Sequence, residues 1–261
     1  MCYDIAFSPD GTKLVTGVGS RVLVYDAADG NLLHSLKAHK DAVYCVSYSR
    51  DGKKFASGGA DRTIIIWSSK AEGVLKYTHN ESIQALAYNP TSAHLASATA
   101  VDFGLWAPDQ KAVVKHKVSA KILSLAWTND GQYLALGQFD GVVSVRDRSG
   151  GEKMKIKLGA PVWTLAWNPN RDEPHDVLAC GCWDESLSFY QLNGTQVGKD
   201  IALDYDPCTV RYFSNGEYMV TGGTNRKVTL ATKEGTPLKD VCVAGSWVWC
   251  AAPRPKQNYV A

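Results

Sequence analysis

Residues 47–58, SYSRDGKKFASG, have the form of two short strands joined by a tight turn. An aromatic residue, Tyr48, ends the first run, Asp51 and Gly52 supply the turn, and apolar and small residues resume at Phe55. Asp-Gly between two such runs is a strong short-range signal for a β-hairpin, because glycine readily adopts the positive φ that these turns need. The segment therefore predicts an antiparallel pair of strands.

The same pattern recurs along the whole chain. Clear copies lie at residues 6–17 (AFSPDGTKLVTG), 126–137 (AWTNDGQYLALG) and 212–222 (YFSNGEYMVTG), and altered copies at 87–98 and 166–181. The aromatic residue before each turn recurs about every 40 residues, with a longer last interval, at Phe7, Tyr48, Tyr88, Trp127, Trp167 and Phe213. Self-similarity at a fixed period of this length is the signature of a repeat architecture.

Each repeat holds four candidate strands. In the second unit they are VYCVSY, FASGG, TIIIW and GVLKYT, at residues 43–48, 55–59, 63–67 and 73–78. Gly-containing turns at this spacing indicate antiparallel strands, and no segment carries a helical period over eleven residues. Four strands per unit, repeated six times and begun a seventh time, predict an all-β β-propeller.

The seventh unit is expected to be truncated. It opens at Ser246 with SWVWC and reaches the last residue, Ala261, in its second strand. Residues 3–7 already form a first strand, so the sequence offers no earlier segment to complete the last sheet. We therefore expect one propeller domain over residues 1–261 that is incomplete at both ends.

The bulk composition excludes several classes of function. Twenty-eight basic and twenty-six acidic residues give a formal net charge of +2, so no global field attracts nucleic acid or an anionic membrane. The seven cysteines are an odd number and mostly lie in apolar runs, which favours reduced, buried thiols over a secreted disulfide framework. No basic n-region, and no apolar run near eighteen residues, precedes or interrupts the repeats, so we expect a soluble intracellular protein.

The residues that end the third strand carry a family resemblance. Trp67 closes TIIIW and Trp106 closes FGLW, while Asp26 and Asp147 stand where a Trp-Asp dipeptide has its aspartate. His39 lies four residues before the first strand of the second unit. With the repeat length, these features resemble the WD40 family of propellers over the entire chain.

The resemblance implies a structural hydrogen-bonded tetrad in blade two. Its members would be His39, Ser57, Asp61 and Trp67, with the histidine linking the aspartate to the serine and the indole N–H. Such a relay would satisfy a buried carboxylate and a buried N–H at once. Blades four, five and six have Arg146, Tyr190 and Ala231 in the tryptophan position, so we expect them to be held mainly by packing.

Asp102-Phe103-Gly104 spells the magnesium-binding motif of protein kinases. A kinase also needs a glycine-rich nucleotide loop, a strand lysine and an HRD-type catalytic loop, and the sequence contains no His-Arg-Asp. Asp102 falls where the other units turn between their second and third strands. We therefore interpret the triplet as a turn, and we expect no catalytic residues.

Two aromatic residues and a basic cluster are the candidates for partner binding. Phe139 and Trp183 each precede the turn aspartate of their blade, where exposed aromatics are typical interaction hot spots; packing on a neighbouring blade is the alternative. Lys115 and Lys117, with Lys111 and Lys121, form a basic stretch that we place in a loop. It either binds an acidic partner or has the protective role of edge lysines, as we infer for the lysines of EKMKIK at residues 152–157.

The sequence gives little support for a metal site. Cys180 and Cys182 form one Cys-Gly-Cys pair with no second pair nearby, and the six histidines show no ligand spacing. Core packing explains the two thiols better. His39, His79 and His116 all precede first strands, so we expect turn-bonding roles for them; no metal or cofactor is expected.

Three segments carry a narrower resemblance, at residues 102–117 (DFGLWAPDQKAVVKHK), 188–200 (SFYQLNGTQVGKD) and 246–249 (SWVW). They resemble the first propellers of a ciliary family, subunits of intraflagellar transport complex A. The resemblance implies a non-catalytic scaffold of retrograde ciliary transport, entry of membrane proteins into the cilium and cilium assembly. It also implies a place in the cilium or flagellum and basal body.

The implied partners are other complex A subunits and ciliary cargo proteins, without nucleic acid, membrane insertion or a small-molecule substrate. Two rival interpretations stay open, a vesicle-coat subunit and a substrate receptor of a ubiquitin ligase. An enzymatic propeller is less favoured, because the first-strand positions are mostly apolar or serine and offer no clustered carboxylates or histidines. The fold alone does not separate these functions.

Overall fold

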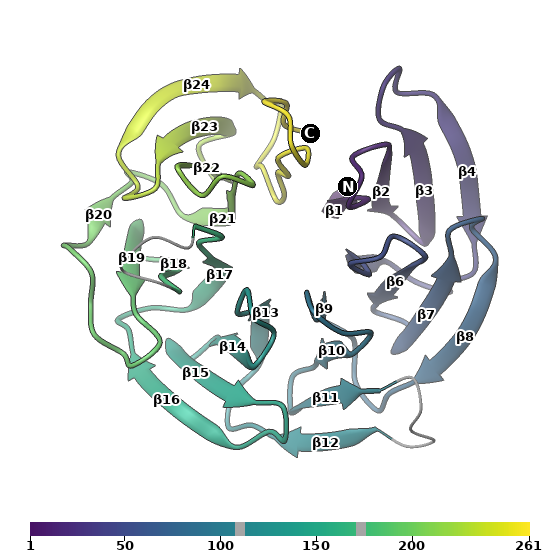
Figure 1. Ribbon diagram of the computed structural model, residues 1–261, viewed down its shortest axis with the longest axis horizontal. Helices are drawn as coiled ribbons and strands as arrows, with labels where there is room; N and C mark the ends of the chain where they lie inside the picture. The colour runs from purple at the N-terminus through teal and green to yellow at the C-terminus, as the bar shows by residue number, and fades with distance from the viewer. Residues whose placement is uncertain (108–112, 171–175) are drawn as a thin grey trace. The chain divides into compact units, whose positions relative to one another are not determined.

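The computed structural model describes residues 1–107, 113–170 and 176–261. Within these ranges the secondary structure consists of strands, arranged as six four-stranded antiparallel sheets, and contains no helix. In every sheet the strands pair in chain order, first with second, second with third and third with fourth (Figure 1). The all-β repeat architecture expected from the sequence is confirmed, and each sheet is one propeller blade.

The chain divides into two compact units, Met1–Ile122 and Leu123–Ala261. The first unit contains blades one to three. Blade one is built from β1 (Cys2–Phe7), β2 (Lys13–Val18), β3 (Arg21–Asp26) and β4 (Leu32–Lys37). Blade two is built from β5 (Val43–Tyr48), β6 (Lys54–Gly59), β7 (Thr63–Ser68) and β8 (Gly73–Thr78). Blade three is built from β9 (Ala85–Tyr88), β10 (Leu95–Ala98), β11 (Asp102–Trp106) and β12 (Val114–Lys117).

The second unit contains blades four to six, apart from Ile122 at the start of blade four, and the residues that follow them. Blade four is built from β13 (Ile122–Trp127), β14 (Tyr133–Gln138), β15 (Val142–Asp147) and β16 (Glu152–Lys157). Blade five is built from β17 (Val162–Trp167), β18 (Leu178–Cys182), β19 (Ser186–Tyr190) and β20 (Ile201–Ala202). Blade six is built from β21 (Pro207–Tyr212), β22 (Tyr218–Gly223), β23 (Lys227–Thr232) and β24 (Pro237–Val243).

The turn between the first and second strands explains why the repeated motif folds as it does. The hydroxyl of Ser8 donates to Asp10 at 2.6 Å, and the same Asp10 oxygen accepts the backbone N–H of Thr12 at 3.0 Å. Ser49 and Asp51 repeat the contact in blade two, and Thr128 and Asp130 repeat it in blade four. The Ser8 hydrogen bond and those from Thr12 lower the pKa of Asp10 to about 2.

Antiparallel alternation gives every blade two different ends. The turn between second and third strands lies at the same end as the connection to the next blade, and we call this the connection end. In blade two the backbone N–H of Ala60, in that turn, donates to the carbonyl of Ala42, in the incoming connection, at 2.8 Å. The N–H of Trp183 donates to Pro161 in the same way in blade five, at 3.0 Å.

Neighbouring blades of one unit are joined by apolar cores. In the first unit, fully buried Val15 and Val22 of blade one pack in one cluster with Val43, Phe55 and other residues of blade two. In the second unit, Phe189 of blade five shares a cluster with residues of blade six. The apolar alternation along the strands therefore faces adjacent blades, as the period of two requires.

Two segments of blade three differ from the sequence-based expectation. Asp102 begins β11, so the Asp-Phe-Gly triplet lies in a strand, and the prediction that it forms a turn is wrong. The turn closes one residue earlier, because the Thr99 hydroxyl caps it by accepting the N–H groups of Val101 and Asp102 at 3.2 and 3.1 Å. Lys115 and Lys117 lie in β12 and not in a loop, because β12 pairs with β11.

The start of the seventh unit also takes a different form. Residues 246–250 adopt no strand, and a single bridge joins Pro253 to Val260. Val248 nevertheless packs as first-strand valines do: a Cβ added to Gly222 of β22 would lie 2.6 Å from its Cγ1. The segment therefore keeps the side-chain position of a first strand without the strand pairing.

Candidate functional site

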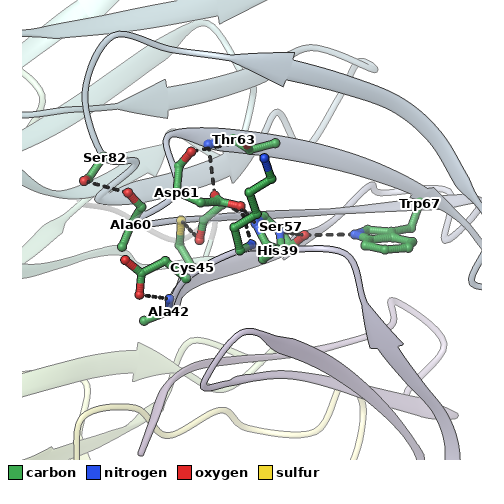
Figure 2. Close-up of polar contacts among 12 residues, drawn as sticks. His39, Ala42, Cys45, Ser57, Ala60, Asp61, Thr63, Trp67 and Ser82 are labelled. Carbon is green, nitrogen blue, oxygen red and sulfur yellow. Dashed lines mark hydrogen bonds and ion pairs between the residues drawn. The ribbon is translucent and has the colours of Figure 1, made fainter.

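Four side chains of blade two form one hydrogen-bonded relay (Figure 2). His39, in the connection before β5, brings Nε2 within 2.8 Å of Ser57 Oγ on β6 and Nδ1 within 3.1 Å of both Asp61 oxygens. Trp67, on β7, donates its indole N–H to the same Ser57 oxygen at 2.9 Å. His39, Ser57 and Trp67 are all buried.

The relay fixes where its protons lie. Ser57 accepts the indole N–H, so its own proton is free to be donated to His39 Nε2. The other ring nitrogen then carries a proton and donates it to Asp61. Burial alone would raise the pKa of Asp61, but hydrogen bonds from the N–H of Lys40, from His39 and from the N–H of Thr63 leave it lowered. This chain of donors and acceptors suits structural support and leaves no group poised to attack a substrate.

Blade three carries an incomplete version of the relay. Trp106 donates its indole N–H to Ser97 Oγ at 2.9 Å, as in blade two. The carboxylate differs: Asp102 accepts the hydroxyl of Thr99 at 2.7 Å. His79 lies against the Trp106 ring, 5.4 Å between centroids, and neither of its buried ring nitrogens has a hydrogen-bond partner among the described residues. The His79 side chain therefore lacks the expected turn-bonding role, although its backbone N–H donates to the carbonyl of Arg62 in the turn before β7 at 2.7 Å.

The unpartnered ring should make stability depend on pH. Burial and the charge of Lys115 lower the pKa of His79 to about 4, against the opposing effect of Asp102, whereas an unfolded histidine titrates near 6.5. Below the unfolded pKa the unfolded chain binds the extra proton, so stability is lost as pH falls from about 6.5 toward about 4.

This pH dependence can be measured by comparing melting temperatures at about pH 7 and about pH 5. The parent should lose about 2–4 °C more between these values than His79→Phe, which keeps a ring against Trp106 but cannot be protonated. An equal fall in melting temperature for the parent and His79→Phe would show that protonation of His79 is not the cause.

Blades four and six replace the relay with other polar contacts. In blade four the Nε–H of Arg146 donates to buried Ser144 at 2.8 Å, and its terminal nitrogen pairs with Glu152 at 2.7 Å. In blade six the hydroxyls of Tyr205 and Thr221 lie 2.7 Å apart, with Thr221 in the position of Ser57. Both blades also contribute residues to buried apolar clusters, as expected, and their polar contacts come from positions that the family pattern does not use.

Blade five relies on apolar packing. Its equivalent of Ser57 is Cys180, which is fully buried in a cluster with Leu165, Leu178 and Tyr190. Cys180 and Cys182 are free thiols, and burial raises the pKa of both, that of Cys182 to about 12.

In the described ranges no three histidine, cysteine or acidic side chains are grouped to hold a metal ion. No helix in these ranges could cross a membrane.

The candidate residues for partner binding are not members of the relay. Lys115 and Lys117 are exposed on β12, the edge strand of blade three, and Lys111 lies outside the described residues. Phe139 is 54% exposed in the turn after β14. Trp183, in the equivalent turn of blade five, is half-buried because its ring stacks on Trp163 of the same blade at 4.0 Å between centroids.

Sequence reasoning missed three further tryptophans near Trp183. Trp163 contacts Trp249, with 6.0 Å between ring centroids, and Trp249 contacts Trp247 at 5.5 Å. The signal available in the sequence was the density of tryptophan: four of the eight in the chain belong to this group. Their meeting depends on the register of three separate segments.

The repeated four-stranded blades and the tryptophan–serine–histidine–aspartate relay define a WD40 β-propeller domain. The family described as "IFT122 first beta-propeller" matches residues 1–261. The chain belongs to this family of intraflagellar transport propellers.

Curated relatives carry the same assignment. The chain is 56% identical, over 99% of its length, to proteins named "Intraflagellar transport protein 122 homolog" from Xenopus tropicalis and Danio rerio. It is 45% identical, over 98% of its length, to the Homo sapiens protein of that name. The aligned region covers 22%, 22% and 26% of these three relatives, so the chain spans about a quarter or less of their length.

Proposed function

We propose that this propeller is a non-catalytic protein-binding scaffold of intraflagellar transport complex A. The observation that carries the proposal is the 56% identity, across nearly the whole chain, to curated intraflagellar transport protein 122 homologues. Within that complex the domain serves retrograde transport, entry of membrane proteins into the cilium and cilium assembly. Its place is the cilium or flagellum and the basal body, on the cytoplasmic side.

The geometry supports binding in place of catalysis. The buried relay of blade two uses its histidine and aspartate to hold strands and turns together, and both are withdrawn from solvent. Asp102 of the Asp-Phe-Gly triplet is engaged with Thr99 at the start of a strand. The surfaces left for function are blade ends and edge strands, which are typical of protein contacts.

Edge strands supply charged binding surface in both units. Lys115 and Lys117 are exposed on β12, and Lys153, Lys155 and Lys157 alternate along β16. Such lysines discourage strand pairing between copies of the chain and leave a basic stripe for an acidic partner segment. The partners we propose are other complex A subunits and ciliary cargo proteins, without nucleic acid, membrane insertion or a small-molecule substrate.

Affinity purification from ciliated cells tests this function. The full-length protein that carries this chain, tagged and expressed at native level, should co-purify with complex A subunits and concentrate at the cilium. The same protein with residues 1–261 deleted should lose part of that association or of its ciliary cargo. Recovery of vesicle-coat or ubiquitin-ligase subunits in place of complex A would replace the proposal with one of those alternatives.

A further inference from the structure

Four tryptophans of the second unit form one continuous aromatic cluster. Trp163 is the second residue of β17, Trp183 follows β18, and Trp247 and Trp249 follow β24. Trp163 and Trp183 are nearly parallel, with 9° between their planes, whereas Trp249 meets Trp163 at 44° and Trp247 at 47°. We call these residues the tryptophan cluster.

The blade register explains why indoles from different blades meet. Val162 packs on Gly137 of blade four, and Val248 packs in the same way on Gly222 of blade six. The residues that follow these valines, Trp163 and Trp249, therefore take equivalent first-strand positions. The blade between them has Cys208 in this position, and that side chain is small and buried, so the two rings make contact.

The cluster presents more aromatic surface than folding requires. Trp247 is 46% exposed and Trp163, Trp183 and Trp249 are half-buried, although indoles gain most from full burial. The Trp183 N–H has no acceptor among the described residues, and the ring stacks on Trp163. Partly exposed, pre-stacked aromatics of this kind are the usual anchors of protein interfaces, because they bind with little loss of side-chain entropy.

Three carboxylates lie at the connection end of blade five, the end that carries Trp183. Asp184 and Glu185 follow Trp183 directly in its turn, and both are exposed. The N–H of Leu203 donates to the carbonyl of Glu185 at 2.8 Å, which brings exposed Asp204 to the same end. Asp184 accepts the hydroxyl of Ser186 at 2.6 Å, and none of the three carboxylates forms an ion pair with a described residue, so their negative charge is not neutralised.

We propose that the tryptophan cluster docks an arginine-bearing segment of a partner protein. A guanidinium plane stacks on an indole face and donates to a carboxylate at its edge, a combination that lysine matches less well because its ammonium is not planar. The aromatic surface and the flanking carboxylates both select a cationic segment. The proposal rests on the proposed role as a protein-binding scaffold and names the chemistry of one of its contacts.

The test uses the purified chain and a fluorescent peptide of alternating glycine and arginine, with a glycine–lysine peptide of equal length for comparison. Anisotropy at near-physiological salt should give saturable binding that favours arginine over lysine. Trp247→Ala, and separately the double variant Asp184→Asn with Glu185→Gln, should each weaken arginine-peptide binding about tenfold. Circular dichroism confirms that each variant is folded.

Tyr218→Ala is the matched control. Tyr218 is an exposed aromatic at the start of β22, at the opposite end of blade six from the connection end, and its loss should leave the affinity unchanged. Unchanged affinity in Trp247→Ala, equal affinity for the arginine and lysine peptides, or no saturable binding would each overturn the proposal. Retained co-purification of complex A in those cases would leave the scaffold function standing.

Discussion

Asp61→Ala should destabilise the domain by about 3 kcal/mol, the cost of breaking a buried, hydrogen-bonded pair. The Asp61 carboxylate, 4% exposed, accepts from His39 Nδ1 and from the N–H groups of Lys40 and Thr63. Its removal leaves a buried imidazole N–H and two backbone donors without an acceptor. Thermal unfolding should show a melting temperature lower by roughly 6–12 °C.

Asp140→Ala provides the comparison for that result. Asp140 occupies the equivalent turn of blade four, but its side chain is exposed and accepts the N–H of Val142 at 3.2 Å. Its replacement should change stability by no more than about 0.5 kcal/mol. Equal melting temperatures for Asp61→Ala and Asp140→Ala would show that the relay contributes nothing beyond an ordinary surface turn.

Gly59→Ala should cost about 3 kcal/mol for a different reason, overpacking against backbone. Gly59 ends β6, and a Cβ there would fall inside contact distance of the Ala42 carbonyl oxygen and 2.9 Å from Val43 Cα. That carbonyl accepts the N–H of Ala60, at the start of the turn that carries Asp61. The added methyl must push the connection away from this turn, so we expect the variant to lose stability and the His39–Asp61 contact together.

The effect of Gly59→Ala can be separated from a general effect of losing glycine. A Cβ on Gly245, in the segment after β24, would meet no atom within 4 Å, so Gly245→Ala should be neutral or slightly stabilising. Denaturant unfolding of both variants measures the difference. A Gly59→Ala protein as stable as Gly245→Ala would mean that the connection before β5 moves without cost.

Local chemistry made blade two predictable from sequence. Its turn residues, strand alternation and relay members all lie within about 30 residues, and each can be recognised by type. The Asp-Phe-Gly triplet was less tractable. Its glycine is explained by packing, because a Cβ on Gly104 would lie 2.9 Å from Val113 and 3.1 Å from Ser97 Oγ, which accepts the Trp106 N–H. The triplet therefore matches a magnesium-binding motif although its glycine is required by close packing.

The contacts that sequence reasoning missed are those between segments distant in the chain. Tyr205 reaches Thr221 from the connection before β21, and no repeat pattern marks a tyrosine there as a substitute for histidine. The tryptophan cluster draws on β17, the turn after β18 and the segment after β24, whose proximity follows from blade order and from the small side chain of Cys208. Contacts of this kind can be predicted only when the strand register and the order of the blades are known.

The polar contacts differ from blade to blade, and this difference affects how the strands of a repetitive chain pair correctly during folding. Sequences built from similar units risk pairing a strand with the wrong copy during folding. Trp67 of β7 and Trp106 of β11 each find a serine hydroxyl on their own second strand, whereas Arg146 in the same position requires Glu152. A swapped third strand would bury an unpaired guanidinium beside Ser57, or leave an indole N–H facing Leu136. Divergence between repeats thus disfavours the pairing of strands from blade two or blade three with strands from blade four.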